Sequence, residues 1–506
     1  IFGSSRALAV GPTAIIAMMT LEAASSYAIP GTVDYTETVV QLCVVTGIVL
    51  IVLRVVNFGS VISFLSHAVV TGFITAAAIL IISNQLPLMI GLASSPDTSI
   101  VGVYRYLFEE MSQFNQVVFI VSLVAVAILV FCKTYLGSLL KRTGLADEVI
   151  DSLVKSAPMY AVVIGVVSVR LFSLDTAFGV PVVGNIPTVL PDINIVLMSL
   201  ERFQALLPSS LLISMVIFME STSIGTAIAS KAREKINPNQ ELVGLGVANL
   251  GSSLVGGFPV AGSFARSIVN FSSGSVSPVA SLVTAFLVMM TILLFATLFF
   301  HLPKGVLSAI IVISAWQLID FQAVRKIFSF NGTDAVTFVF TFLAVLSLGV
   351  ESGVLIGIAI SFVLLIRSSS KPRIAVVGRV GDSEHFRNVE RYDVRTSPKL
   401  LALRVDESLY FVNTRFIETF ILNDVADRRE VEHVLLICTS INFIDTSGLE
   451  MLEELSENLS EVGVTLHMAE VKGPVMDKLK ETGFYRNMNG QIFFTTDIAM
   501  KELAGI

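Results

Sequence analysis

The chain consists largely of long apolar runs separated by short polar loops. A full bilayer crossing takes about 20 apolar residues as a helix, and most of these runs approach that length. Two runs, at 12–25 and 263–271, are clearly shorter and are predicted to be half-helices. The predicted spans are 12–25, 37–56, 66–92, 114–132, 155–173, 205–230, 239–257, 263–271, 278–300, 304–319, 333–350 and 352–367.

The pattern changes after Arg367. A polar stretch at 371–390 is predicted to be a linker between a membrane domain at 1–370 and a second domain at 391–506. In that second domain "KLLALRV", "VEHVLLICTS" and "TLHMAEV" have the composition of strands, and "SGLEMLEELSENLSEV" and "PVMDKLKETGF" have a helical period. The alternation predicts a small α/β domain with one sheet faced by helices.

Composition supports a polytopic membrane protein. Of the 506 residues, 54% are hydrophobic and 14% are charged, and the mean hydropathy is +0.80, whereas about a quarter of a typical soluble domain is charged. A net charge of −7 gives no support for nucleic-acid binding. The three cysteines are far apart and the sequence has no Walker motif. We therefore expect no metal, no cofactor, no catalytic residue and no enzymatic activity.

Lysine and arginine gather in alternate loops. They follow the runs that end at 132, 230, 319 and 367, whereas the loop at 26–36 has none. By the positive-inside rule, the basic loops and the C-terminal domain are cytoplasmic, which indicates a multi-pass protein of the inner (plasma) membrane. The sequence begins at Ile1 in an already apolar region, so we expect an N-terminal part of the protein to be missing.

The two half-helices have similar sequences before them. Gly11 and Pro12 precede the first, and Gly262 and Ser263 precede the second, which are signals for a helix start. Two interrupted segments at matching places in two halves indicate a transport site. Helix N-termini attract anions, and Arg266 adds a permanent positive charge. The alternative is that Arg266 extends to water or pairs with a structural carboxylate.

Glu220 is a second charged residue in an apolar run, "LLISMVIFMESTSIGTAIAS". A carboxylate at such a position is costly unless it is paired or protonated. Ionisable residues inside spans are usually functional, so Glu220 is a candidate proton carrier. The alternative is a structural partner for Arg266 or for a hydroxyl group.

Several stretches resemble the SulP sulfate-permease family, whose animal members form the solute-carrier-26 group. The stretches are "FGSSRALAVGP", "FLSHAVVTGF", "NQELVGLGVANLGSSLVGGFPVAGSFARS", "LPKGVLSAII", "VESGVLIGI" and, in the C-terminal domain, the STAS-like "FIDTSGLEML". The resemblance implies fourteen spans in two inverted seven-span repeats, followed by a cytoplasmic STAS domain. Twelve spans are predicted here, so the first two would be missing. The resemblance also implies a homodimer.

The resemblance places an anion between the N-termini of the two half-helices. The substrate-binding residues it implies are Thr13, Ala14, Ser263, Phe264, Ala265 and Arg266. Many animal members of the family have a serine where Ala265 stands and a phenylalanine where Thr13 stands, so their substrate choice does not transfer. Many plant-like and bacterial proton symporters of the family have Glu at the position of Glu220. Ser447 matches the serine that is phosphorylated in related anti-sigma-factor antagonists, but the motif favours the alternative of a helix cap or turn, because Asp, Thr and Ser are preferred at helix N-termini.

Three functions follow as hypotheses. The first is proton-coupled sulfate uptake by alternating access, which Glu220 favours. The second is an exchanger for chloride, bicarbonate or a dicarboxylate. The third is a membrane-anchored sensor whose STAS domain is the output, and the paired half-helices argue against it because a sensor needs no anion site within the membrane. Separately from these three functions, a regulatory protein is an expected partner of the STAS domain.

Overall fold

The structure is a computed structural model of the chain. It describes residues 2–59, 66–96, 99–185, 193, 198–275 and 277–505. Within these ranges it describes the backbone but not the side chains of Ala14, Glu148, Lys231, Phe264, Ala265, Ser272, Val350 and Glu351. The chain divides into two compact units, Ile1–Ile360 and Ser361–Ile506.

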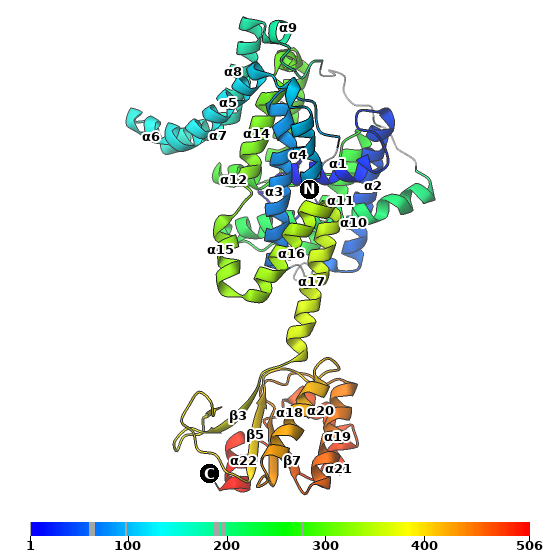
Figure 1. Cartoon of the computed structure of the whole chain (residues 1–506), viewed down its shortest axis with the longest axis vertical. Helices are drawn as coiled ribbons and strands as arrows, with labels where there is room; N and C mark the ends of the chain where they lie inside the picture. The colour runs from blue at the N-terminus through cyan, green and yellow to red at the C-terminus, as the bar shows by residue number, and fades with distance from the viewer. Residues whose placement is uncertain are drawn as a thin grey trace. The chain divides into compact units, whose positions relative to one another are not determined.

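Each of the twelve predicted spans overlaps a helix of the structure (Figure 1). These helices are α1 (Ala14–Ser25), α2 (Val33–Val55), α3 (His67–Met89), α5 (Gln116–Phe131), α8 (Ala157–Phe172), α10 (Leu200–Ala232), α11 (Pro238–Leu254), α12 (Phe264–Ser272), α13 (Val279–Phe295), α14 (Lys304–Trp316), α16 (Gly332–Leu348) and α17 (Val350–Ser370). Among the described residues, seven helices are long and apolar enough to cross a membrane, or up to eight if a pair bent by 51° at residue 156 forms one span. With 12 and 9 residues, α1 and α12 are too short to cross, as predicted.

Several helices occupy stretches that the sequence analysis left as loops. They are α4 (Ile100–Glu109), α6 (Gly137–Leu140), α7 (Asp147–Lys155), α9 (Leu174–Phe178) and α15 (Phe321–Phe330), together with short 3₁₀ or π segments at Met111–Gln113, Cys132–Leu136 and Lys141–Thr143. A further 3₁₀ segment, Ala296–His301, follows α13 at the end of the predicted span 278–300. In α4, α7 and α15 apolar residues alternate with charged ones at helical spacing, so a search for continuous apolar runs passes over them.

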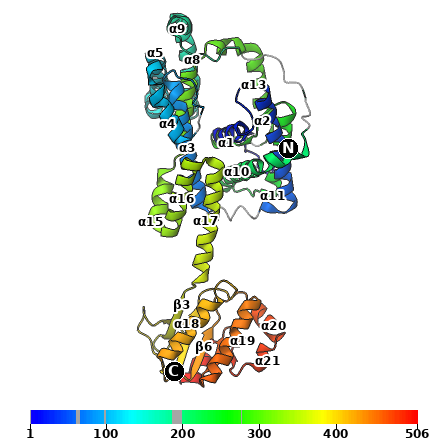
Figure 2. The same cartoon turned by 45° about the vertical axis from the view of Figure 1, so that its right-hand side comes forward.

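The helices of the first unit pack in two groups. The first bundle contains α1, α2, α10, α11 and α12, and the second bundle contains α3, α5, α8, α14 and α16. Figure 2 shows α1, α2, α10 and α11 on one side and α5, α8, α15 and α16 on the other. In the first bundle α2 and α11 approach closely at two glycines, because a Cβ on Gly47 would lie 3.0 Å from the carbonyl oxygen of Gly246. Small residues give membrane helices this close contact.

The second unit is built on a six-stranded sheet with the order β4-β3-β5-β6-β7-β8. The strands are β3 (Ile374–Arg379), β4 (Phe386–Asn388), β5 (Leu400–Val405), β6 (His433–Ile437), β7 (Thr465–Ala469) and β8 (Ile492–Phe493). Strands β5 to β8 are parallel, while β3 is antiparallel to both of its neighbours. This sheet, which is faced by helices, confirms the predicted α/β domain.

Alternate residues of the central strands face two apolar layers. Leu401, Leu403 and Leu436 pack against one set of helices, and Leu435 and Ile437 pack against α22 on the opposite face. The helices of the first layer are α18 (Thr414–Asp427), α19 (Thr446–Glu461), α20 (Gly473–Lys480) and α21 (Phe484–Asn487), and α22 spans Thr496–Ala504. Period-two alternation of this kind is what a sheet covered on both faces requires.

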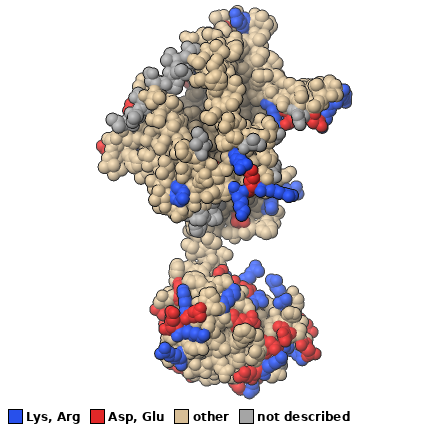
Figure 3. Space-filling view, turned by 180° about the vertical axis from the view of Figure 1, so that it is seen from behind, with Lys and Arg blue, Asp and Glu red and all other residues tan. Residues whose placement is uncertain are grey.

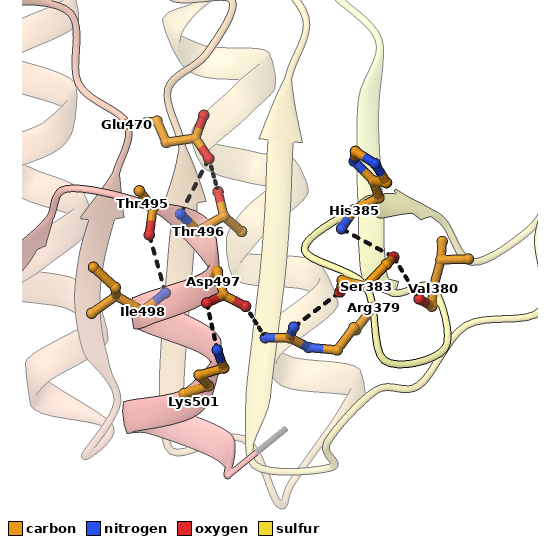
Figure 4. Close-up of polar contacts among 10 residues, drawn as sticks. All are labelled: Arg379, Val380, Ser383, His385, Glu470, Thr495, Thr496, Asp497, Ile498 and Lys501. Carbon is orange, nitrogen blue, oxygen red and sulfur yellow. Dashed lines mark hydrogen bonds and ion pairs between the residues drawn. The ribbon is translucent and has the colours of Figure 1, made fainter.

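The predicted linker at 371–390 differs from the structure, because it contains β3 and β4. Arg379, which is 5% exposed, fixes β3 to the rest of the unit. Its guanidinium Nη2 lies 2.6 Å from Asp497 Oδ1 in α22, and its Nη1 donates to the carbonyl oxygen of Ser383 at 3.0 Å (Figure 4). The polar side chain of Arg379 therefore makes its contacts within the second unit, and this stretch is part of that unit rather than a linker.

The two units differ in surface charge. In the face drawn in Figure 3, most of the first unit is uncharged, and charged side chains of both signs are dense over the second. An uncharged surface is what a lipid-facing unit requires, and a densely charged one is typical of a domain in water.

Candidate anion site

A two-stranded ladder places the two half-helices. β1 (Val10–Gly11) pairs antiparallel with β2 (Ala261–Gly262), with Val10 opposite Gly262 and Gly11 opposite Ala261. A further hydrogen bond runs from the backbone N–H of Ser263 to the carbonyl oxygen of Ala9, 2.9 Å away. Because the strands are antiparallel, α1 and α12 leave the ladder in opposite directions, and both N-termini lie beside it.

Each half-helix starts from an extended residue with a hydroxyl group. Thr13 and Ser263 are the N-cap residues of α1 and α12, and neither side chain caps its helix within the described structure. Thr13 Oγ1 is buried and has no hydrogen-bond partner among the described residues. The first backbone N–H groups of a helix also have no partner inside it. The two starts therefore offer unused donors.

Arg266 joins the two half-helices. It is the third residue of α12, and its Nη2 donates a hydrogen bond to the carbonyl oxygen of Pro12 at 2.8 Å. Pro12 directly precedes Thr13, the N-cap residue of α1. No carboxylate of the described residues lies within 4 Å of its guanidinium. The positive charge of Arg266 is thus held by a neutral carbonyl group and is not neutralised.

Gly11 makes this position of Arg266 possible. A Cβ on Gly11 would lie 2.7 Å from Arg266 Nη1 and 3.0 Å from Nη2, closer than side-chain atoms pack. The glycine before Pro12, which the sequence analysis took as a helix-start signal, therefore also makes room for the guanidinium group.

Two serines that the sequence analysis missed fix the ladder. Ser221 Oγ of α10 accepts a hydrogen bond from the backbone N–H of Gly262 at 2.8 Å, and Ser267 Oγ of α12 accepts one from Ala9 N at 2.9 Å. Both serines are fully buried. Their signal in the sequence was their position directly after Glu220 and Arg266.

Glu220 directly precedes Ser221, the residue of α10 that accepts a hydrogen bond from the ladder. Its Oε2 is buried and has no hydrogen-bond partner in the described part of the chain. Glu220 forms no ion pair with Arg266 among the described residues, so the structural pairing considered from the sequence is not present. A carboxylate oxygen left without a partner in a membrane span is available to a proton.

The remaining candidate residues fall into two groups. Ala14, Phe264 and Ala265 supply backbone to the two helix starts, but their side chains lie outside the described residues. Ser447 lies in the other unit, as the second residue of α19. The N-cap of that helix is Asp445, whose Oδ1 accepts a hydrogen bond from the backbone N–H of Gly448 at 2.8 Å. Ser447 is therefore not needed for capping.

The described residues contain no group of three or more His, Cys, Asp or Glu side chains that is arranged to hold a metal ion. The arrangement around the ladder offers donors and a positive charge to a small anion. Oε2 of Glu220, which has no hydrogen-bond partner among the described residues, offers an acceptor to a proton.

Comparison with known proteins supports this assignment at the level of family and fold. The Sulfate permease family matches residues 1–341, and the STAS domain family matches residues 391–499. Probable sulfate transporter 4.2 of Arabidopsis thaliana is 30% identical over 98% of this chain and 73% of its own length. High affinity sulfate transporter 2 of Stylosanthes hamata is 28% identical over 94% of this chain and 73% of its own.

Solved structures show the same fold at lower identity. The murine Solute Carrier 26 family member A9 anion transporter in the inward-facing state matches with a TM-score of 0.86 and 19% identity, over 99% of this chain and 83% of that one. The transmembrane domain of the cyanobacterium bicarbonate transporter BicA matches with a TM-score of 0.58 and 20% identity, over 71% of this chain and 85% of that one. The predicted transporter fold with a C-terminal STAS domain is confirmed.

Proposed function

Because this chain belongs to the sulfate permease family of anion transporters, we propose that it takes up sulfate together with protons by alternating access. Sulfate is the anion named for the relatives in Arabidopsis thaliana and Stylosanthes hamata. We further propose that it works as a homodimer in the inner (plasma) membrane, with the STAS domain in the cytoplasm.

The observation that carries the proposal is the bridge from Arg266 to the carbonyl oxygen of Pro12. It holds an un-neutralised cation at the meeting point of two helix N-termini. An anion there would be attracted by the positive charge of Arg266. It would also accept hydrogen bonds from backbone N–H groups at the starts of α1 and α12 and from the hydroxyl groups of Thr13 and Ser263. Thr13, whose Oγ1 is buried without a described partner, gains a hydrogen bond when the anion arrives.

Glu220 supplies the coupling to protons. Each negative charge that enters a negative-inside cell costs about 2.3 kcal/mol per 100 mV, so a divalent anion costs roughly twice that amount. A proton bound by Glu220 cancels one of these charges. Binding of the anion adds negative charge near Glu220 and favours the protonated carboxyl group, and linkage then requires the proton to favour the anion.

The test is uptake of labelled sulfate into proteoliposomes that contain the whole protein. With the interior negative, we expect an inward proton gradient to drive accumulation above the level reached without a gradient. Competing chloride, bicarbonate and dicarboxylates placed outside measure which anions share the site. If sulfate enters only against one of these anions placed inside, whatever the proton gradient, the chain is an exchanger and the symport proposal is wrong.

A further inference from the structure

Apolar side chains from both bundles meet at a small cavity. Val216 and Met219 of α10, in the first bundle, line this cavity with Phe73 of α3, in the second bundle, and with Val354 and Ile358 of α17. Apolar side chains of this kind give no directional contact, so they allow packed helices to slide.

A carboxylate lies at another contact between the two bundles. Glu22 lies in the last part of α1, and its side chain rests on the backbone of Gly349, which separates α16 from α17. A Cβ on Gly349 would collide with Glu22 Oε1 and lie 3.1 Å from its carboxyl carbon. This contact joins residues 22 and 349, and it connects a half-helix of the anion site to the second bundle.

The backbone of Gly349 has a conformation that favours glycine. Its φ of 87° and ψ of 172° belong to a region that essentially only glycine occupies. After it α17 folds back tightly on α16, because a Cβ on Gly353 would lie 2.5 Å from the Cα of Val345. The carboxylate of Glu22 therefore meets the N-terminal end of α17, where the helix dipole attracts negative charge.

We propose that Glu22 is a positioning residue that holds the first bundle against the second in one of the two states of the transport cycle. The proposal rests on the alternating access proposed above. The first bundle carries the ladder, α1 and α12, so moving it relative to α16 and α17 exposes the anion site to the other side. Glu22 must leave the N-terminal end of α17 during this movement. Its contact biases the equilibrium between the two states without touching the anion.

The test measures which side of the membrane reaches the anion site. A cysteine at Thr13 (Thr13→Cys) is labelled with a membrane-impermeant thiol reagent from the outside of right-side-out vesicles and from the outside of inside-out vesicles. The native cysteines Cys43 and Cys132 are buried, and unsubstituted protein gives their background. Adding Glu22→Gln should change the ratio of labelling from the two sides about fivefold, as the loss of a carboxylate at a helix N-terminus predicts.

The matched control is Glu37→Gln, which removes an exposed carboxylate of α2 that accepts a hydrogen bond from Gln41 in the same helix. It should leave the labelling ratio unchanged. Glu22→Asp, whose shorter side chain reaches less far, should shift the ratio in the same direction as Glu22→Gln and decides the matter if Glu22→Gln does not fold. An unchanged ratio in a folded Glu22 variant would overturn the proposal. Labelling is carried out without sulfate and at one fixed pH, so it requires neither anion transport nor proton coupling, and this outcome is separate from a failure of sulfate symport.

Discussion

Arg379 of the second unit and Arg266 of the first, which are buried and partly buried, show two ways to hold an arginine side chain. Arg379 has a carboxylate at 2.6 Å, a carbonyl oxygen at 3.0 Å and the ring of Phe386 5.1 Å away. Arg266 has the carbonyl oxygen of Pro12 and, among the described residues, no carboxylate. The first unit also contains Glu220, whose buried Oε2 has no hydrogen-bond partner among the described residues, and no ion pair between Glu220 and Arg266 is formed there.

We infer that the difference separates a structural charge from a functional one. A buried charge without a partner is costly, and pairing it within the protein is the usual remedy. In the second unit, the partners belong to the chain and remain in place. In the first unit, we infer that the missing partners arrive from solution, an anion for Arg266 and a proton for Glu220.

The largest effect is expected from Arg266→Ala. It removes the positive charge opposite the anion, so we expect sulfate binding to fall below detection in calorimetry while the protein stays folded in detergent. Arg266→Lys should keep part of the affinity, because a point charge remains without the planar fork. Arg170→Ala, which removes an exposed arginine from α8, is the control and should bind as the parent does. Undiminished sulfate binding by Arg266→Ala would contradict the site assignment.

Glu220→Gln imitates the protonated carboxyl group and is expected to uncouple transport from protons. Anion binding should become nearly independent of pH, and anion exchange can continue, but accumulation driven by a proton gradient should be lost. The measurement is labelled-sulfate uptake under an imposed pH gradient, with Glu201→Gln at the exposed start of the same helix as the control. Accumulation equal to that of the parent would remove Glu220 from the coupling and favour an exchanger.

Arg379→Ala tests the other side of the comparison. It removes the ion pair that joins β3 to Asp497 of α22, so that Lys501 is the remaining ion-pair partner of Asp497. We expect lower stability of the second unit and no change in sulfate affinity. Hydrogen exchange at β3 and α22 in the whole protein should accelerate by roughly tenfold or more, as expected for a broken buried ion pair. Exchange at the parent's rate would show that the Arg379 network is not structural.

The pH dependence of this variant has a definite sign. Hydrogen bonds from Lys501 and then from Arg379 hold the pKa of Asp497 below its usual value of 3.8. A carboxyl group whose pKa is lowered by folding stabilises the fold at any pH above its usual pKa. This contribution is lost as the pH falls through the pKa of the folded state. The difference in exchange between the parent and Arg379→Ala should therefore shrink in acid.

Gly11→Ala should have a smaller effect on the site than removal of Arg266. The new methyl group would lie 2.7 Å from Arg266 Nη1 and must displace the guanidinium group from Pro12. We expect sulfate affinity to fall about tenfold, which corresponds to roughly 1.4 kcal/mol. Gly251→Ala in α11, where a Cβ would meet nothing within 4 Å, is the control. Equal affinities of the two variants would show that the Arg266–Pro12 contact does not shape the site.

The parts of the structure that the sequence predicted depend on local signals. Long apolar runs located the membrane helices, and the short runs before Ser25 and after Ser263 located the two half-helices, because length and composition decide which helices cross a bilayer. The residues at the helix starts could also be predicted from the sequence, since Gly, Pro and Ser there are signals for the start of a helix.

The remaining parts depend on contacts between distant residues. Ser221 and Ser267 each bond the backbone of a strand or segment far along the chain, and a single buried serine in a span has no distinctive pattern. The stretch at 371–390 looked like a linker because its polar residues, such as Arg379, find their partners in α22, more than a hundred residues later. The contact of Glu22 with Gly349 has the same cause.

The smallest effect is expected from Ser447→Asp, which adds a charge in a place where the fold can partner it. Ser447 is the second residue of α19, and a negative charge at a helix N-terminus is favourable by about 0.3–1 kcal/mol. The second unit should therefore stay folded, and transport rate or binding of a regulatory protein should change without a change in sulfate affinity. Ser456→Asp in the middle of the same helix is the control, because the dipole effect is confined to the first turn. If a chain that ends at Arg373 transports in cells with unchanged rate and regulation, the second unit has no regulatory role, and a charge at Ser447 would be structural alone.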